Sequence, residues 1–222
     1  MANAGFSAPL SGKFPSVAGL KAKESEAGVA SSLATAVDNV GDVVASDVYG
    51  QTENPSCTFV VETDADLSGI SLGSVTGGIM LTQVVVTTQA GEHPTVQMSG
   101  VKIEEGGSAQ RTYSLSGTVK ARSKAQDIAG AFSASEKMTS CTTTFSVQPH
   151  MATVKGVPVA SDCSDCRCEV NATLTDPSGS ATLEPTADFV VSSAATSTQP
   201  DSDYVSVTCT AVKFLTGSES SS

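Results

Sequence analysis

Over residues 167–175 the chain reads RCEVNATLT, in which apolar and polar side chains alternate at every position. Cys168, Val170, Ala172 and Leu174 are the apolar members, and the residues between them are charged or polar. Successive side chains of a β-strand point to opposite faces. The alternation therefore predicts a strand with one face in a core and the other face in water.

Further stretches rich in Thr, Val and Ser extend this pattern on both sides. They span residues 58–62, 79–89, 94–104, 111–124, 141–148, 151–157, 187–193 and 203–215. Several are much longer than the usual strand of about 5–6 residues. Glycines at 106–107 and at 179 predict two β-hairpins. The sequence thus predicts a mainly β fold, a sandwich or barrel of about eight to ten long antiparallel strands with at most two helices.

The predicted helices are short. Val29, Leu33, Val37 and Val40 recur at helical spacing, which favours a short helix in the N-terminal region. A second helix is expected over residues 126–138. The predicted organisation is an extended N-terminal arm with this short helix over residues 1–50, a β-sandwich or barrel domain over 51–215, and a disordered tail over 216–222.

Composition excludes several classes of protein. Of 222 residues, 16% are charged, 39% are hydrophobic and none is Trp, and 23 acids against 12 bases give a net charge of −11. Such an acidic chain lacks the positive surface that grips nucleic acid, and no apolar run is long enough to span a membrane. Small apolar side chains bury little area each, so the core is thin for this length. We expect neighbouring copies to supply further burial.

The six cysteines leave three interpretations open. They are Cys57, Cys141, Cys163, Cys166, Cys168 and Cys209. Residues 1–19 contain no basic segment followed by an apolar run, which argues against secretion and therefore against a disulfide framework. The cluster of Cys163, Cys166 and Cys168 could instead bind zinc with another cysteine or His150 as further ligand. Reduced, structural thiols are the third interpretation.

Two motifs resemble functional sites but lack their context. Residues 69–73 (GISLG) match the pattern of a nucleophilic serine at Ser71, yet no strand precedes them and no helix follows. Residues 64–69 (DADLSG) resemble half of a calcium loop, but Val75 stands where the bidentate Glu is needed. We therefore assign no catalytic, cofactor or metal residue and do not expect an enzyme. The surrounding residues 64–78 form a long Gly/Ser-rich loop, which is typical of functional segments.

Three bases stand two residues apart at Lys120, Arg122 and Lys124. In the expected strand they share one face, which would be a positive stripe on a negative protein. The stripe is a plain solvent face or a seam to an acidic patch on another copy. A nucleic-acid contact ranks last, because no aromatic residues lie between the bases for stacking. Asp64 and Asp66, in the long loop, complete the candidate assembly residues.

The chain resembles the major tail (tail tube) proteins of long-tailed bacteriophages. The resemblance lies in the long Thr/Val/Ser strands of the body, the mid-chain helix candidate, the early loop, the Ala/Gly/Pro arm and the closing strand. These features occupy residues 47–215, 126–138, 64–78, 1–50 and 203–215.

This resemblance implies a β-sandwich or barrel subunit, six of which join their sheets into a ring. Rings would stack into a tube through the early loop and the arm, and the acidic lumen would conduct DNA without retaining it. The implied partners are further copies of the chain and other tail proteins, with transient passage of DNA and no membrane. The implied location is the virion tail, assembled in the host cytoplasm.

Three other functions stay open on the sequence. A capsid decoration or head-surface protein would also be β-rich but would dock on a lattice of other subunits. An adhesin-like binding module is disfavoured by the scarcity of Trp and Tyr, which sugar sites and interface hot spots favour. A hydrolase using Ser71 or a cysteine-bound metal ranks last.

Overall fold

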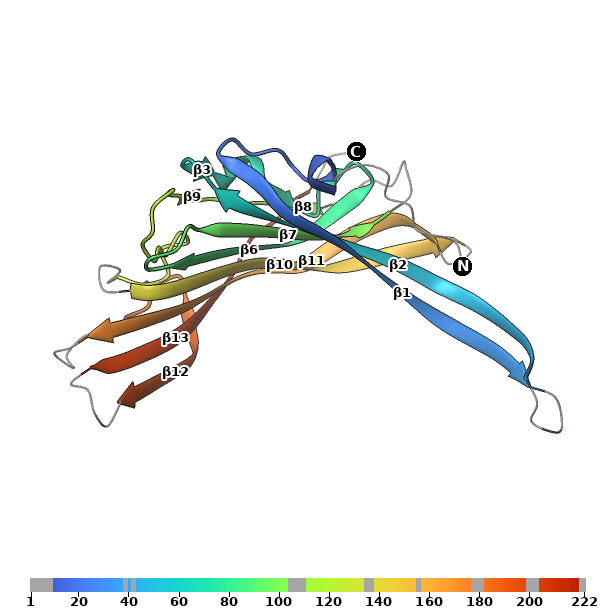
Figure 1. Cartoon of the computed structure of the whole chain (residues 1–222). Helices are drawn as coiled ribbons and strands as arrows, with labels where there is room; N and C mark the ends of the chain where they lie inside the picture. Colours follow the sequence, from blue (N-terminus) through green and yellow to red (C-terminus); the bar gives the residue numbers. More distant parts are fainter. Residues whose placement is uncertain are drawn as a thin grey trace.

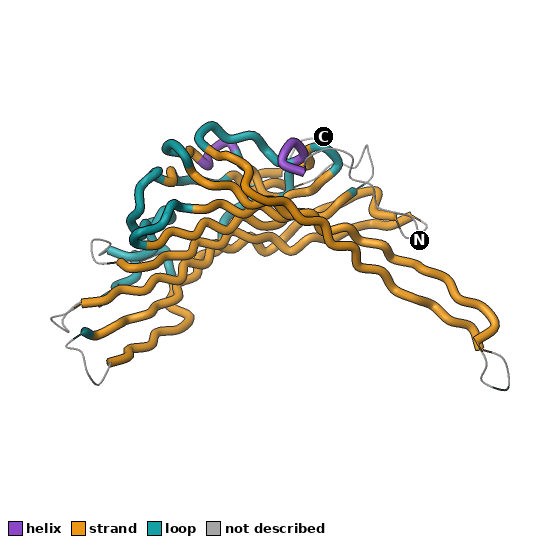
Figure 2. Tube along the Cα trace, viewed as in Figure 1, coloured by secondary structure: helices purple, strands orange, loops and turns teal. Residues whose placement is uncertain are grey.

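The computed structural model describes residues 10–37, 40, 43–103, 111–133, 138–154, 157–176, 182–198 and 204–219. Within them, the helical elements are two short 3₁₀ turns, η1 (Leu10–Lys13) and η2 (Leu67–Gly69). The strands form a broad arched sheet with smaller sheets and loops packed on one of its faces (Figure 1; Figure 2). The chain is therefore mainly β with a sandwich-like arrangement, as the alternation of residues 167–175 predicts.

The broad sheet is antiparallel and contains nine strands. Its order along the main path is β1 (Leu20–Val37), β2 (Val43–Val61), β7 (Thr95–Lys102), β6 (Ile79–Gln89), β10 (Met138–Val154), β11 (Val157–Asp176), β13 (Val205–Phe214) and β12 (Val190–Thr198), and β5 (Val75–Thr76) pairs with β6 off this path. Strands β6, β7, β10 and β11 alternate buried residues, mostly apolar, toward the second layer with mainly polar residues on the opposite face, so a single register buries one face only.

Short strands and loops make up the second layer. These strands are β3 (Ala65–Asp66) paired with β9 (Thr118–Val119), and β14 (Ser218–Glu219), β8 (Arg111–Ser114) and β4 (Ser71–Leu72) in that order. Leu67, Ile70 and Leu72 from this layer have no exposed surface and belong to one hydrophobic cluster with Val84 of β6 and Val170 of β11. The core therefore lies between the arched sheet and this layer.

Two ribbons project beyond the other strands. β2 pairs with β7 only over residues 56–60, so residues 43–55 of β2 pair with β1 alone among the described strands. Figure 1 shows this β1–β2 ribbon leaving the sheet as a long arm. Similarly, β6 and β13 accompany β10 and β11 only as far as Ser146 and Arg167, and the two strands continue together to the pair Val154–Val157.

The predicted N-terminal helix is wrong, because Val29, Leu33 and Val37 lie in strand β1 and Val40 lies in a turn beyond its end. Val29, Leu33 and Val37 pair with residues of β2, which supplies the backbone partners that a helix would have found within itself. Between Ala27 and Val37, nine residues of β1 are Ala, Val, Ser or Thr. This mixture of residue types does not by itself decide between a helix and a strand, so the pairing with β2 decides. β2 also runs continuously through residue 50, where arm and domain were expected to meet.

The second predicted helix is also absent from the described residues 126–133, which form bends and turns. Asp127 accepts hydrogen bonds from the backbone N–H groups of Ala129 and Phe132, an arrangement that closes a loop and competes with a helix. Residues 134–137 of the prediction lie outside the described residues.

Both predicted hairpins are wrong. β7 and β8, the strands expected to pair around residues 106–107, belong to different sheets. β11 pairs with β10 and β13, and β12 lies beyond β13 at the edge, so no hairpin forms around residue 179. The glycines at 106–107 and 179 themselves lie outside the described residues, and the strands that follow them pair with more distant partners.

Residues 64–78, predicted as a free loop, hold three short strands and η2 and fill the core. Of the tail predicted to be disordered, Ser218 and Glu219 pair with Thr112 and Arg111, and residues 220–222 lie outside the described residues. In the part of the chain that is described, no helix is both long and apolar enough to cross a membrane.

Candidate assembly surfaces

The three candidate bases follow strand β9 but are not in a strand. β9 ends at Val119, and two tight turns follow, in which the N–H of Arg122 donates to the carbonyl of Lys120 and the N–H of Lys124 donates to that of Arg122, both at 2.8 Å. The strand expected over residues 111–124 is therefore broken. Because each turn advances the chain by two residues, Lys120, Arg122 and Lys124 still lie along one short segment and are all exposed.

Gln126 holds this segment from beneath. Its side-chain oxygen accepts from the N–H of Lys120 at 2.9 Å, and its amide nitrogen donates to the carbonyls of Lys120 at 2.8 Å and Lys124 at 3.4 Å. The backbone N–H of Gln126 donates to the buried hydroxyl of Thr88 on β6 at 2.8 Å. A buried, saturated amide of this kind fixes the loop to the sheet.

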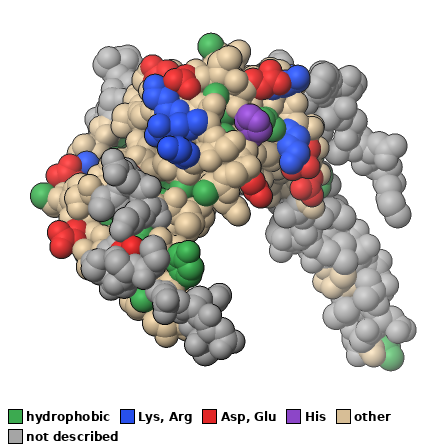
Figure 3. All heavy atoms as spheres, turned by 60° about the vertical axis from the view of Figure 1, so that its left-hand side comes forward, with side chains coloured by type: hydrophobic (Ala, Val, Ile, Leu, Met, Phe, Trp, Pro, Cys, Tyr) green, Lys and Arg blue, Asp and Glu red, His purple; other side chains and the backbone are tan. Residues whose placement is uncertain are grey.

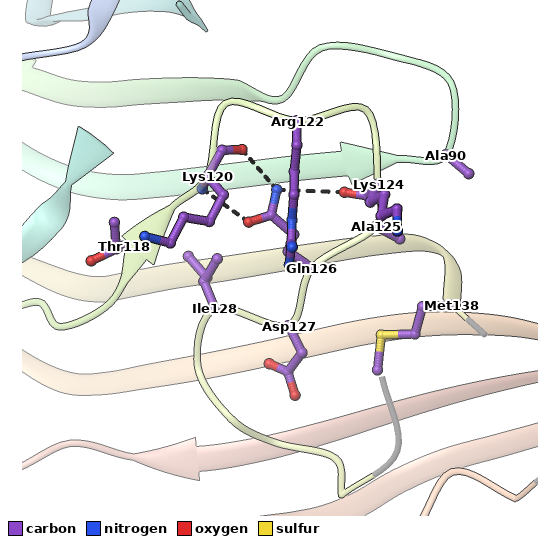
Figure 4. Close-up of a pocket in the computed structure, with 10 residues that line it drawn as sticks. All are labelled: Ala90, Thr118, Lys120, Arg122, Lys124, Ala125, Gln126, Asp127, Ile128 and Met138. Carbon is purple, nitrogen blue, oxygen red and sulfur yellow. Dashed lines mark hydrogen bonds between the residues drawn. The ribbon is translucent and has the colours of Figure 1, made fainter. Parts of the chain in front are cut away.

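The bases border an open hollow of about 830 Å³ between this segment and the start of β10 (Figure 4). Its lining residues are Ala90, Thr118, Lys120, Arg122, Lys124, Ala125, Gln126, Asp127, Ile128 and Met138. We call this feature the basic hollow. Figure 3 shows one larger group of Lys and Arg side chains on this face of the molecule, with smaller groups elsewhere.

Asp64 and Lys120, predicted separately, are brought together. The Lys120 Nζ lies 3.0 Å from the Asp64 Oδ2, and the N–H of Ala121 donates to the Asp64 Oδ1 at 2.9 Å. The Ala121 N–H first, and then Lys120, hold the pKa of the Asp64 carboxyl below its usual range. Lys120 is thus partly neutralised, whereas Arg122 and Lys124 make no ion pair within the described residues.

Asp66 has a local structural role. Its carboxylate caps η2 by accepting from the N–H of Ser68 at 3.0 Å, and this bond lowers the pKa of Asp66. Asp64 and Asp66 therefore bind different backbone groups. Among the described residues, no three His, Cys, Asp or Glu side chains are grouped to hold a metal ion.

All six cysteines are free and buried. Burial raises the pKa of Cys141, Cys166 and Cys168 to about 12 and that of Cys163 to about 11. The Cys163 Sγ contacts the carbonyl of Arg111 at 3.0 Å. Of the three interpretations, the structure favours reduced thiols that pack in the core, because all six are buried there and no three potential ligand side chains are grouped among the described residues.

The other predicted motifs do not form catalytic arrangements in the described residues. The Ser71 Oγ lies 3.2 Å from the hydroxyl of Ser114, in the two-residue strand β4, without the strand-to-helix turn that exposes a nucleophile. The His150 Nε2 lies 2.8 Å from the Ser164 Oγ, on the ribbon formed by β10 and β11.

The largest surface that the sequence analysis missed is the uncovered face of the arched sheet. Cross-strand pairing places polar residues in continuous rows, one of which contains Thr95, Thr87, Thr142, Asn171 and Thr210. We call this the hydroxyl face. The signal was present in each strand as the polar half of its alternation, but the pairing order that joins the strands could not be known.

Charge is sparse on the central strands of the hydroxyl face. Arg167 and Glu169 of β11 are two residues apart on this face, with the Arg167 Nη2 3.7 Å from the Glu169 Oε2. The neighbouring positions on β6, β7 and β10 are Thr, Ser, Gln and Val. The face is therefore polar but nearly uncharged at its centre.

The arched sheet ends in two unpaired edges, β1 and β12. All nine residues of β12 are exposed, and Val190 retains 73% of its surface. Phe214, at the end of the adjacent β13, is 71% exposed. An edge strand with exposed apolar residues is a recognised site of association.

Comparison with known proteins adds no family. No protein-family model matches the sequence, and no curated protein matches it. The function is therefore argued from the surfaces described above.

Proposed function

We propose that this chain is a structural, self-assembling virion protein that forms the stacked rings of a bacteriophage tail tube. The observation that carries the proposal is the pair of unpaired edges, β1 and β12, at the two ends of one sheet. Such edges are templates for strand pairing between chains. Joining β12 of one copy to β1 of the next is a heterologous contact, which closes into a ring when the rotation permits.

The exposure of β12 supports this mode of association. Both of its faces are exposed, so within one chain the strand is held chiefly by its ladder to β13. Pairing its free edge with another copy would satisfy further backbone groups and cover Val190 and Val191, which are 73% and 39% exposed. The number of copies, six, follows the resemblance to major tail proteins.

The hydroxyl face supports the role of a conduit. A lining of Thr, Ser and Gln offers phosphate few cations. Arg167 is the only Lys or Arg among the described residues of β6, β10 and β11, and it stands beside Glu169. Each copy carries a net charge of −11, and a ring of six carries six times that charge. The negative charge of the ring as a whole repels the duplex, and the nearly uncharged lining offers it few cations, so that DNA would pass without binding. Other tail proteins would cap the tube.

The test is the assembly state of the purified chain. Sedimentation over a range of concentrations and negative-stain imaging should show rings or tubes. Replacing Val191 and Ala195 on β12 by Lys should raise the concentration needed for assembly at least about tenfold, since charges on an edge oppose pairing. The matched control places Lys at Thr87 and Gln97 of the hydroxyl face, away from both edges, and should still assemble.

Other outcomes identify the alternatives. A stable monomer or trimer that binds only to capsids would replace the proposal by a head-surface protein. A monomer that binds glycans would replace it by an adhesin-like module. Either result, with no ring at any concentration, overturns the tail-tube proposal.

A further inference from the structure

The arm formed by β1 and β2 is strongly acidic. Between residues 24 and 54 the sequence contains six acids and no Lys or Arg. Glu24 and Glu26 are exposed, and Glu53 is held by a base, with the Lys102 Nζ 2.9 Å from its Oε1. The arm thus carries more than half of the net charge of −11 in about a seventh of the chain.

The arm also has little internal support. Residues 43–55 of β2 pair only with β1 among the described strands, so this part is a two-stranded ribbon. Isolated two-stranded ribbons are marginally stable in water unless another element covers them. Val29, 51% exposed, and Val40, 81% exposed, add apolar surface to the arm. A surface that could cover the arm should therefore be both cationic and partly apolar.

The basic hollow has the complementary chemistry. Arg122 and Lys124 are exposed bases without an ion pair in the described residues, and Ile128 and Met138 supply apolar lining. Asp127 and Asp64 also face this region and reduce its charge. Asp64 is paired with Lys120 and Asp127 with two backbone N–H groups, which leaves Arg122 and Lys124 as the available cations.

The arm and the hollow of one chain cannot meet. The last residues of β2 pair with the start of β7, and the start of β7 pairs with the end of β6. Ala90, which lines the hollow, directly follows the end of β6. The outer end of β2, at Val43, lies eighteen residues back along the strand, which is about 60 Å at the usual rise. Figure 1 shows the arm extending away from β9, the strand that leads into the basic segment.

We propose that the acidic arm of one copy docks in the basic hollow of the next copy. The inference rests on the proposed self-assembly and specifies which surfaces join. Arg122 and Lys124 would face the acids of the arm, among them the exposed Glu26, while Ile128 and Met138 would meet its exposed valines, Val29 and Val40. Such a contact fixes the register between copies and weakens as salt screens it, over about 10 Å at 0.1 M.

A charge-swap experiment on the full chain tests this contact. The hollow variant carries Arg122→Glu and Lys124→Glu, the arm variant carries Glu26→Lys and Asp47→Lys, and the combined variant carries all four. Each two-residue variant should need at least about tenfold more protein to assemble. The combined variant, which has the net charge of the wild type, should recover assembly. The control, Lys13→Glu with Arg167→Glu, matches the hollow variant in charge and should assemble normally.

A second measurement separates this inference from the proposed function. A carbodiimide joins carboxylates to amines, and a mixture of light and isotope-labelled chains identifies links between copies. Links between Lys124 or Lys120 and the acids of residues 24–54 support the docking, whether or not rings are seen. Rings without such links, or a combined variant that fails to recover, overturn the docking and leave the proposed function standing. Links without any ring or tube overturn the proposed function alone.

Discussion

The Nζ of Lys120 lies 3.0 Å from the Oδ2 of Asp64, across 56 residues of sequence. Both side chains are about half exposed, and exposed ion pairs of this kind contribute little to stability. Its importance is positional. The pair joins the segment that follows β2 to the rim of the basic hollow. It also engages Lys120, so Arg122 and Lys124 are the bases of the hollow without an ion pair among the described residues.

The first prediction concerns the titration of Asp64. Its pKa is lowered by the Ala121 N–H first and by Lys120 second, so Lys120→Met should raise it while leaving it below the usual range. Because the folded pKa is depressed, any stabilisation from this carboxylate is present above the unfolded pKa and is lost as pH falls through the folded pKa. NMR titration of the carboxyl carbon measures both values. An unchanged pKa in Lys120→Met would show that the ion pair does not form in solution.

The second prediction concerns residues 64–78 as part of the core. Leu67 has no exposed surface, so Leu67→Ala should lower the free energy of unfolding by about 2–5 kcal/mol. Thr76→Ala, at an exposed position of the same segment, should change it by less than about 0.5 kcal/mol. Urea unfolding measures both. A cost below about 1 kcal/mol for Leu67→Ala would restore the interpretation of this segment as a free loop.

The strand around Val170 and residues 64–78 show what the sequence could and could not predict. Strict alternation, as around Val170, depends on residues two apart, so it could be recognised without knowing which strands pair. The fold class and most strands of the broad sheet followed from it. Residues 64–78 gave no such signal, since Leu67, Ile70 and Leu72 are separated by Gly and Ser and become a core only when the sheet lies beneath them.

Only part of the candidate site could be predicted from the sequence. Spacing placed Lys120, Arg122 and Lys124 together, and they do border one hollow, although turns and not a strand achieve this. Their attachment depends on Thr88 and Asp64, at 38 and 57 residues from the atoms they bind, which no local pattern encodes. The helical spacing of Val29 and Val37 misled for the same reason, because the pairing of β1 with β2 overrides local periodicity.

The third prediction concerns the thiols. With pKa values raised to about 11 or 12 and no exposure, Cys141, Cys163, Cys166 and Cys168 should not react with Ellman's reagent at pH 8 in the folded protein. All six thiols should react once the chain is unfolded in guanidinium. Ser192→Cys, on the exposed strand β12, should add one fast-reacting thiol as the control. Fast reaction of any native cysteine would contradict the buried, reduced cluster.

The last prediction contrasts two glycines of the segment that fills the core. Gly73 has φ of +79°, and a Cβ there would lie 2.5 Å from the Cys163 Sγ and 2.6 Å from the Arg111 carbonyl oxygen. Gly73→Ala should therefore cost several kcal/mol, because the chain is strained and a backbone atom must move. Gly69→Ala meets nothing within 4 Å and has no positive φ, so it should be nearly neutral or stabilising. Thermal unfolding of the two variants tests this contrast. Equal melting temperatures would mean that β4 does not approach β11 and β8 as closely as the fold requires. The second layer would then have to be placed differently.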